Sequence, residues 1–142
     1  MDFNRILVPV KNGGRADEEA LKLACRLARR SKGKVCAVYV IEVQRALPLE
    51  AQIEPEIRKG EKVLDQAERL AEEQDYQVET ELLQAREVAP AIVDAAVDGK
   101  VDLIMMGLAY KRPFGEFSLG SIMPYVLKNA PCPVLVLREP AS

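Results

Sequence analysis

Two glycine-bearing loops carry the residue types that bind anions. Residues 11–14 join Lys11 to two glycines, and residues 107–121 contain Lys111 and end in Gly120-Ser121. A helix is predicted to begin at the end of the second loop, where Ser121 is a natural N-cap. A helix N-terminus that follows a glycine offers amide N–H groups and partial positive charge to a phosphate. The pattern indicates an anion site, and the alternative is that Gly120-Ser121 forms only a turn and a cap.

Composition excludes many other kinds of chemistry. The 142 residues include no histidine, which removes Ser-His-Asp and Cys-His nucleophilic sites, histidine metal ligands and imidazole as a general base. Glu116 is the only carboxylate in the second loop, and the chain has no Walker lysine motif. We therefore expect no catalytic residue, no metal and no enzymatic turnover. A formal net charge of −2 argues against binding to nucleic acid.

Cysteine usage and hydropathy indicate a cytoplasmic protein. The three cysteines, Cys25, Cys36 and Cys132, are odd in number and form no CxxC motif, so reduced, buried thiols are expected in place of disulfides. No apolar run approaches the roughly 18 residues that span a bilayer, and residues 1–5 do not open a signal peptide. Direct insertion into a membrane is not expected.

Apolar runs alternate with amphipathic stretches along the whole chain. The runs predict strands over residues 6–10, 35–41, 78–83, 102–106 and 134–137. The amphipathic stretches predict helices over residues 17–31, after Pro55, over 88–98 and over 121–129. We expect Gly60 to bend or fray the start of the second helix. Pro9 fits only at the end of its strand, where the loop begins.

This order of elements predicts one α/β domain over residues 1–142, with a parallel sheet and helices on both faces. Glu79 and Glu81 lie on one face of their strand, which suits an edge of the sheet. In open sheets of this class, ligands bind beyond the carboxyl ends of the strands. Both glycine-bearing loops follow such ends, so we expect them to meet at one site.

The second loop and the segment after it resemble the C-terminal signature of the universal stress protein family. The resemblance rests on Met106-Gly107, Gly120-Ser121 and the stretch 125–134, and residues 6–10 and 102–107 fit the same family. It implies a three-layer α/β/α fold with a five-stranded parallel sheet of order 3-2-1-4-5. It also implies a homodimer that pairs through the last strand, and the uncovered apolar edge formed by Val134, Leu135, Val136 and Leu137 agrees with that.

The family resemblance also bears on nucleotide binding. Members that bind ATP carry glycines at positions matching Gly107 and Gly120, followed by serine or threonine, as at Ser121. This chain has Tyr110 where they have another glycine, and Lys11 where they have an acidic residue that engages ribose. A tyrosine disfavours positive φ and adds a ring, and a lost hydrogen bond to a charged acceptor costs about 1.5–3 kcal/mol. These departures predict that ATP binds weakly.

We therefore expect a cytosolic, dimeric regulatory or sensing module of the stress-response class with a degenerate adenine-nucleotide pocket. It requires no cofactor, and ATP or AMP is the candidate ligand. The residues expected around that ligand are Val10, Lys11, Ile41, Gly107, Tyr110, Gly120, Ser121 and Ile122. Two alternatives stay open: a conventional ATP-binding member, and a ligand-independent interaction module for a membrane transporter. The second rests on stretches 40–50 and 111–117, which are similar to universal stress domains fused to amino-acid permeases.

Overall fold

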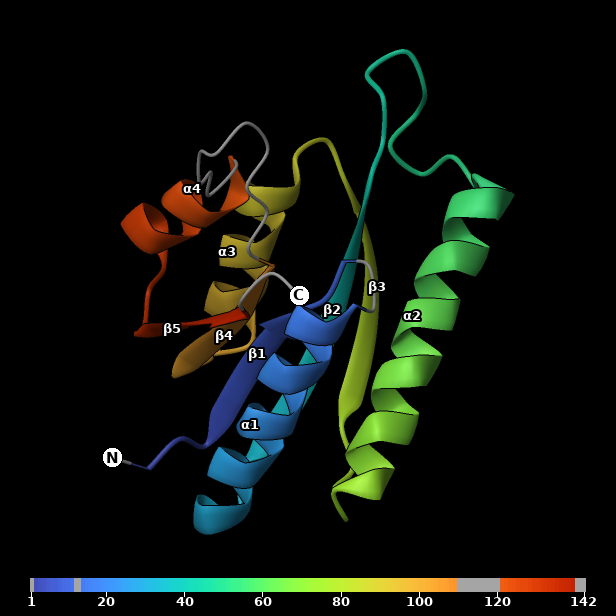
Figure 1. Ribbon diagram of the computed structural model, residues 1–142. Helices are drawn as coiled ribbons and strands as arrows, with labels where there is room; N and C mark the ends of the chain where they lie inside the picture. Colours follow the sequence, from blue (N-terminus) through green and yellow to red (C-terminus); the bar gives the residue numbers. More distant parts are fainter. Residues whose placement is uncertain (1, 12–13, 110–120, 140–142) are drawn as a thin grey trace, which may run out of the picture.

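A computed structural model describes residues 2–11, 14–109 and 121–139 of the chain (Figure 1). Strands and helices alternate throughout. In chain order the elements are β1 (Arg5–Pro9), α1 (Arg15–Ser31), β2 (Lys34–Glu42), α2 (Glu54–Glu73), β3 (Glu79–Ala85), α3 (Val88–Asp98), β4 (Leu103–Ala109), α4 (Ile122–Asn129) and β5 (Val134–Glu139). This order confirms the predicted elements, with boundaries that differ by at most three residues.

The five strands form one parallel sheet of order β3-β2-β1-β4-β5, as expected. Side-chain and backbone hydrogen bonds together fix the pairing of β1 with β4. The Asp102 carboxylate, just before β4, accepts the backbone N–H groups of Asn4 and Arg5 at 2.8 and 3.0 Å. The amide of Asp102 donates in turn to the carbonyl of Arg5 at 2.9 Å. This reciprocal bonding sets the register of β4 against β1, and so aligns the loops that follow both strands.

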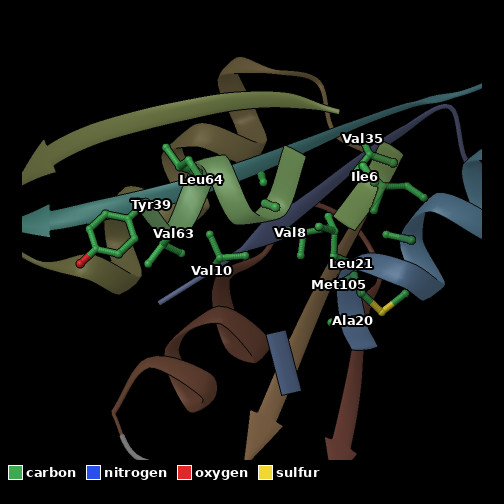
Figure 2. Close-up of a cluster of buried hydrophobic side chains, with 14 of the residues drawn as sticks. Ile6, Val8, Val10, Ala20, Leu21, Val35, Tyr39, Val63, Leu64 and Met105 are labelled. Carbon is green, nitrogen blue, oxygen red and sulfur yellow. The ribbon is translucent and has the colours of Figure 1, made fainter. Parts of the chain in front are cut away.

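Two apolar clusters hold the helices on opposite faces of the sheet. One cluster joins the sheet to α1 and α2 through residues such as Ile6, Leu21 and Leu64 (Figure 2). The other joins it to α3 and α4 through Ile92 and Val126. The structure thus has the three layers predicted for the fold, and every strand between the edges is covered on both faces.

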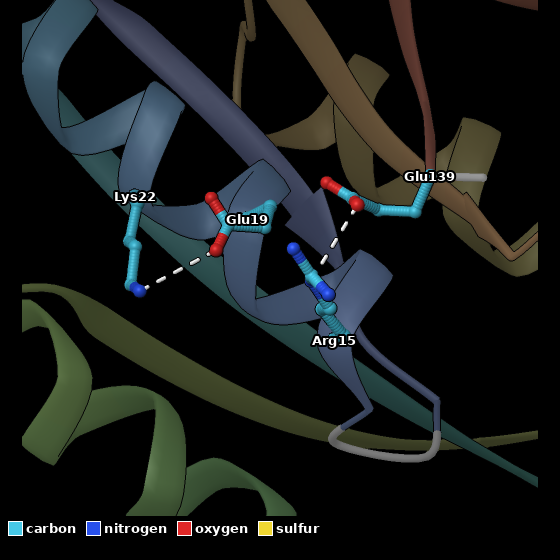
Figure 3. A network of polar contacts seen from close by, with 4 residues as sticks. All are labelled: Arg15, Glu19, Lys22 and Glu139. Carbon is cyan, nitrogen blue, oxygen red and sulfur yellow. Dashed lines mark hydrogen bonds and ion pairs between the residues drawn. The ribbon is translucent and has the colours of Figure 1, made fainter. Parts of the chain in front are cut away.

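The edges of the sheet differ in character. β3 carries exposed Glu79 and Glu81, whereas β5 exposes Leu135 and Val136. At the end of β5, Glu139 forms an ion pair of 3.5 Å with Arg15, the first residue of α1 (Figure 3). The Arg15 side chain is 75% exposed, so this pair adds little stability.

The second helix departs from the expectation at Gly60. α2 runs unbroken from Glu54 to Glu73, and the predicted bend or fraying is wrong. Gly60 is buried, and a Cβ at this position would lie 2.6 Å from Leu82 Cδ1 and 2.8 Å from Tyr39 Cδ1. The glycine therefore allows α2 to approach the sheet closely, and this packing offsets its low helix propensity.

The first helix begins two residues earlier than expected. Its acidic first-turn residues are Asp17 and Glu18. None of the helices within the described ranges combines the length and apolar character that crossing a bilayer requires.

Candidate functional site

A cleft of about 710 Å³ opens at the edge of the sheet where the strands end. Its apolar floor comes from the ends of β1, β2 and β4, through Pro9, Val38, Val40 and Met106. The starts of α1, α3 and α4 close its sides. Ligands of open α/β sheets bind at this place, where the strand order reverses between β1 and β4.

The structure brings most of the predicted site residues to this cleft. Val10, Lys11, Gly107, Ser121 and Ile122 all line it. The two remaining residues of the glycine-rich signature, Tyr110 and Gly120, lie outside the described residues.

Ile41 is placed elsewhere. Its side chain is 2% exposed and packs in the cluster between the sheet, α1 and α2. The residues on either side of it along β2, Val40 and Glu42, line the cleft instead. Alternate residues of a strand point to opposite faces, so a shift of one position moves a side chain out of the site.

Gly107 lies where β4 meets the start of α1. A Cβ at this position would be 2.3 Å from the carbonyl oxygen of Ala16 and 3.0 Å from the amide nitrogen of Asp17. These are backbone atoms and cannot move aside as a flexible side chain can. The glycine is thus required for packing, whether or not a ligand approaches it, and it holds the first turn of α1 against the cleft.

The first turn of α1 brings a carboxylate into the cleft that the sequence did not single out. Asp17 lines the cleft, and its Oδ2 accepts the backbone N–H of Lys11 at 2.8 Å. This bond ties the loop after β1 to α1. A carboxylate therefore stands beside the position where Lys11 replaces the family's acidic residue.

The start of α4 provides the positive end of a helix at the cleft. Ser121 occupies the N-cap position, but its side chain makes no capping hydrogen bond, so that part of the prediction is wrong. Its backbone is helical, with φ −92° and ψ −24°, whereas a capping residue is normally extended. Pro124 lacks an N–H, and no acidic residue lies in the first turn. The amides of Ile122 and Met123 thus receive no capping bond from the Ser121 side chain.

The outer rim of the cleft is mainly acidic. Glu42 at the end of β2, Glu56 in α2 and Glu87 before α3 line it, together with Lys59. Sequence reasoning missed these four residues because they flank two separate connections, β2–α2 and β3–α3, which only the folded sheet brings together. The signal that they share is their place after a strand or in the first turns of a helix. We refer to Glu42, Glu56, Lys59 and Glu87 as the outer rim.

The three cysteines are free thiols in packed surroundings. Burial raises the pKa of Cys25 and of Cys36 to about 11, and the carboxylates of Glu81 and Glu79 contribute at Cys36. Burial also raises the pKa of Cys132, with a smaller contribution from Asp102. Since the thiolate is the reactive form, these surroundings suppress reactivity and favour the packing role expected from the sequence.

Titration with a thiol reagent should show this suppression directly. With a pKa of about 11, only about one thiol in a thousand is ionised at pH 8 for Cys25 and Cys36. We expect the folded protein to react much more slowly than the same protein in denaturant, where all three react. The raised pKa values also predict a fall in the free energy of unfolding as pH rises from 9 towards 11, because only the unfolded thiols ionise in that window. One fast-reacting thiol in the folded protein would contradict this account.

Within the described parts of the chain, no group of three or more cysteine or acidic side chains is arranged to hold a metal ion. The described residues of the cleft offer hydrogen bonding, apolar contact and helix-terminus electrostatics. That combination suits a ligand with one apolar ring and one anionic group.

Comparison with known proteins identifies the family of this chain. The family model described as the universal stress protein family matches residues 2–138. A universal stress protein of Methanocaldococcus jannaschii is 34% identical, over 97% of this chain and 84% of that protein.

Solved structures of similar proteins have the same fold. One is the universal stress protein from Archaeoglobus fulgidus in complex with dAMP, with a TM-score of 0.76, 21% identity, and coverage of 96% of this chain and 98% of that one. Another is a family member from Arabidopsis thaliana with AMP bound, with a TM-score of 0.69, 16% identity, and coverage of 96% and 92%. The family model covers nearly the whole chain and the fold agrees with it, so the chain belongs to the universal stress protein family.

Proposed function

We propose that this protein is a regulatory module that binds an adenine nucleotide in the cleft and prefers one phosphate to three. The observation that carries the proposal is the cleft itself, which joins an apolar floor to the N-terminus of α4. The relatives from Archaeoglobus and Arabidopsis, solved with dAMP and AMP, support this choice of ligand. The protein needs no catalytic turnover for such a role.

The arrangement of the cleft suggests how a nucleotide would lie. The apolar ends of β1 and β2, with Val10, Val38 and Val40, suit the faces of a purine ring. The amides of Ile122 and Met123 at the start of α4 suit a phosphate, because they add hydrogen-bond donors to the positive end of the helix dipole. A ribose between these groups would lie near Lys11 and Asp17.

The charge of the cleft favours a monophosphate. Among the described lining residues there are four carboxylates, those of Asp17 and the three rim glutamates, and two lysines, Lys11 and Lys59. Each further phosphate brings negative charge towards this acidic surface, and like charges repel most strongly where water is partly excluded. The Tyr110 departure from the ATP-binding pattern acts in the same direction, whereas the Lys11 departure weakens the ribose contact of AMP and ATP alike.

Calorimetric titration with AMP, ADP and ATP, each with and without magnesium, tests the proposal. We expect saturable heat with AMP and at least about tenfold weaker binding of ATP, which corresponds to about 1.4 kcal/mol. Absence of heat at millimolar AMP would retire the proposed function. Tighter binding of ATP than of AMP would instead support the conventional ATP-binding alternative. Phosphate release from ATP no faster than in buffer is expected in the same samples.

Lys11→Asp should strengthen AMP binding by about tenfold. A carboxylate at this position restores an acceptor for the ribose hydroxyls, and a charged hydrogen bond of this kind contributes about 1.5–3 kcal/mol. Part of that gain is offset by repulsion from the carboxylate of Asp17, 2.8 Å from the Lys11 amide. Lys34→Asp, at the opposite end of β2, makes the same charge change far from the cleft and serves as the control. Equal affinities for both variants would place the nucleotide elsewhere.

We further propose that the protein is a cytoplasmic homodimer. The apolar outer edge of β5 supports the dimer, because an unpaired apolar edge strand invites pairing with a second copy. The transporter partner stays a prediction of the sequence. Co-purification with a permease from membranes would favour it, and capture of none would count against it.

A further inference from the structure

The connection between β2 and α2, residues 43–53, extends beyond the carboxyl edge of the sheet (Figure 1). We call this segment the β2–α2 arm. Val43, at the start of the arm, is buried in the core, but the tip exposes Leu47 and Leu49, which are 40% and 38% exposed, so the arm buries little apolar surface beyond Val43. Within it, only two turn bonds are made by the backbone, from Leu47 to Gln44 and from Ala51 to Pro48, each 3.0 Å long. Something other than an apolar core must fix its course.

Two side chains at the end of β3 bind the arm. The Arg86 guanidinium donates through Nη1 to the carbonyl oxygens of Gln44 at 2.6 Å and Leu47 at 2.8 Å, with a longer contact of 3.4 Å to Val43. The Gln84 amide donates through Nε2 to the carbonyl oxygens of Leu49 and Ala51, both at 2.9 Å. Both side chains are half-buried, and the bonds from Gln84 to Ala51 and from Arg86 to Val43 are partly shielded from water. Five carbonyls of the arm thus converge on two residues.

The arm connects separate parts of the outer rim. Glu42 immediately precedes it, and Glu56 and Lys59 follow it in the first turns of α2. Glu87, the fourth rim residue, is the neighbour of Arg86. Neither Arg86 nor Gln84 is among the described residues that line the cleft. Arg86 thus stands at the junction of the chain segments that carry the rim, without facing the ligand.

We infer that Arg86, assisted by Gln84, is a positioning residue of the nucleotide cleft, which fixes the outer rim through the β2–α2 arm. This inference rests on the proposed function. Loss of the guanidinium leaves carbonyls of the arm without hydrogen-bond donors. The arm then adopts other conformations, which displace Glu42 and the start of α2. The apparent affinity for the ligand then falls in proportion to the fraction of molecules in which the rim is correctly placed.

Variants of Arg86 test the inference by two measurements on the full-length protein. Hydrogen exchange without ligand reports the order of the arm through the amides of Leu47 and Ala51, and calorimetry reports AMP affinity. We expect Arg86→Ala to accelerate exchange of these amides by at least about tenfold, with exchange of β1 and β4 unchanged, and to weaken AMP binding about tenfold. Gln84→Ala should show the same pattern with smaller changes.

Two further variants separate positioning from a general effect of charge or stability. Arg86→Lys keeps the charge and one or two of the donors, and should restore part of both effects. Arg26→Ala removes an exposed arginine on α1 and should change neither. If Arg86→Ala accelerates exchange in the arm but keeps an AMP affinity within twofold of that of the parent, the inference is overturned and the proposed function stands. No AMP binding by the parent protein would overturn the proposed function and the inference with it, whereas unchanged arm exchange in Arg86→Ala would refute the contact itself.

Discussion

Gly107→Ala is expected to lower the free energy of unfolding by about 3 kcal/mol, the upper range for overpacking. The added Cβ would lie 2.3 Å from the carbonyl oxygen of Ala16 and 2.5 Å from its carbonyl carbon, so the start of α1 must move as a unit. Such a movement also displaces Asp17 from Lys11 and deforms the cleft. Urea unfolding measures the stability, and AMP titration of the folded fraction measures the cleft.

Gly14→Ala is the matched control for that substitution. Gly14 lies in the other loop of the site, at the N-cap of α1, and a Cβ there would meet nothing within 4 Å. Its φ of −80° suits any residue. The weaker N-cap preference of alanine and the reduced entropy of the unfolded chain oppose one another, so the change should stay within about 0.5 kcal/mol. Equal stabilities of the two variants would contradict the packing role of Gly107.

Leu135→Lys is expected to convert the proposed dimer into a monomer. Leu135 is 42% exposed and Val136 is 37% exposed, and they lie on opposite faces of β5, whose outer edge is unpaired in the sheet. Pairing of two such edges in a symmetric dimer would bury Leu135 of both copies, at up to about 1.5–3 kcal/mol per side chain. Replacement by lysine removes both contributions, so the dissociation constant should rise at least about a hundredfold.

Analytical ultracentrifugation over a range of concentrations measures that change. Val97→Lys is the control, because Val97 is 55% exposed on α3 and lies away from the β5 edge. We expect a dimer for the parent and for Val97→Lys, and a monomer for Leu135→Lys. A monomeric parent at high micromolar concentration, or a dimer that survives Leu135→Lys, would exclude pairing through β5.

The contrast between the two edges of the sheet explains why only one is expected to pair. β3 carries the exposed carboxylates of Glu79 and Glu81, and a second copy would bring like charges together there. β5 has no such charges until Arg138 and Glu139. The charge pattern of residues 79–81 indicated an edge from the sequence, whereas the edge position of residues 134–137 followed from the family resemblance.

The fold was predictable because each of its elements has a strong local pattern. The continuous apolar run over residues 35–41 is typical of a strand covered on both faces, and the stripe of Ile92, Val93 and Ala96 is typical of a helix. The helix over 88–98 was predicted with its observed boundaries. Gly60 was misread because local propensity does not show which strands a helix will contact.

The site was predictable only in part, since its residues come from connections far apart in the chain. Residues next to the glycine-bearing loops, such as Val10 and Ser121, were found from their place after a strand or before a helix. Asp17, Glu42 and Glu87 were not, because their approach depends on strand order and on how each helix begins. Nor does sequence reveal that Arg86 donates to carbonyls about forty residues away, as this contact exists only after β2 and β3 pair.

A crystal structure of the protein grown with AMP tests the central claim most directly. The account predicts density for the purine against the ends of β1 and β2, near Val10 and Val40, with the phosphate at the amides of Ile122 and Met123. It also predicts that the carboxylate of Asp17 lies on the ribose side of the nucleotide. An empty cleft at millimolar AMP, or AMP bound at any other surface, would contradict the account.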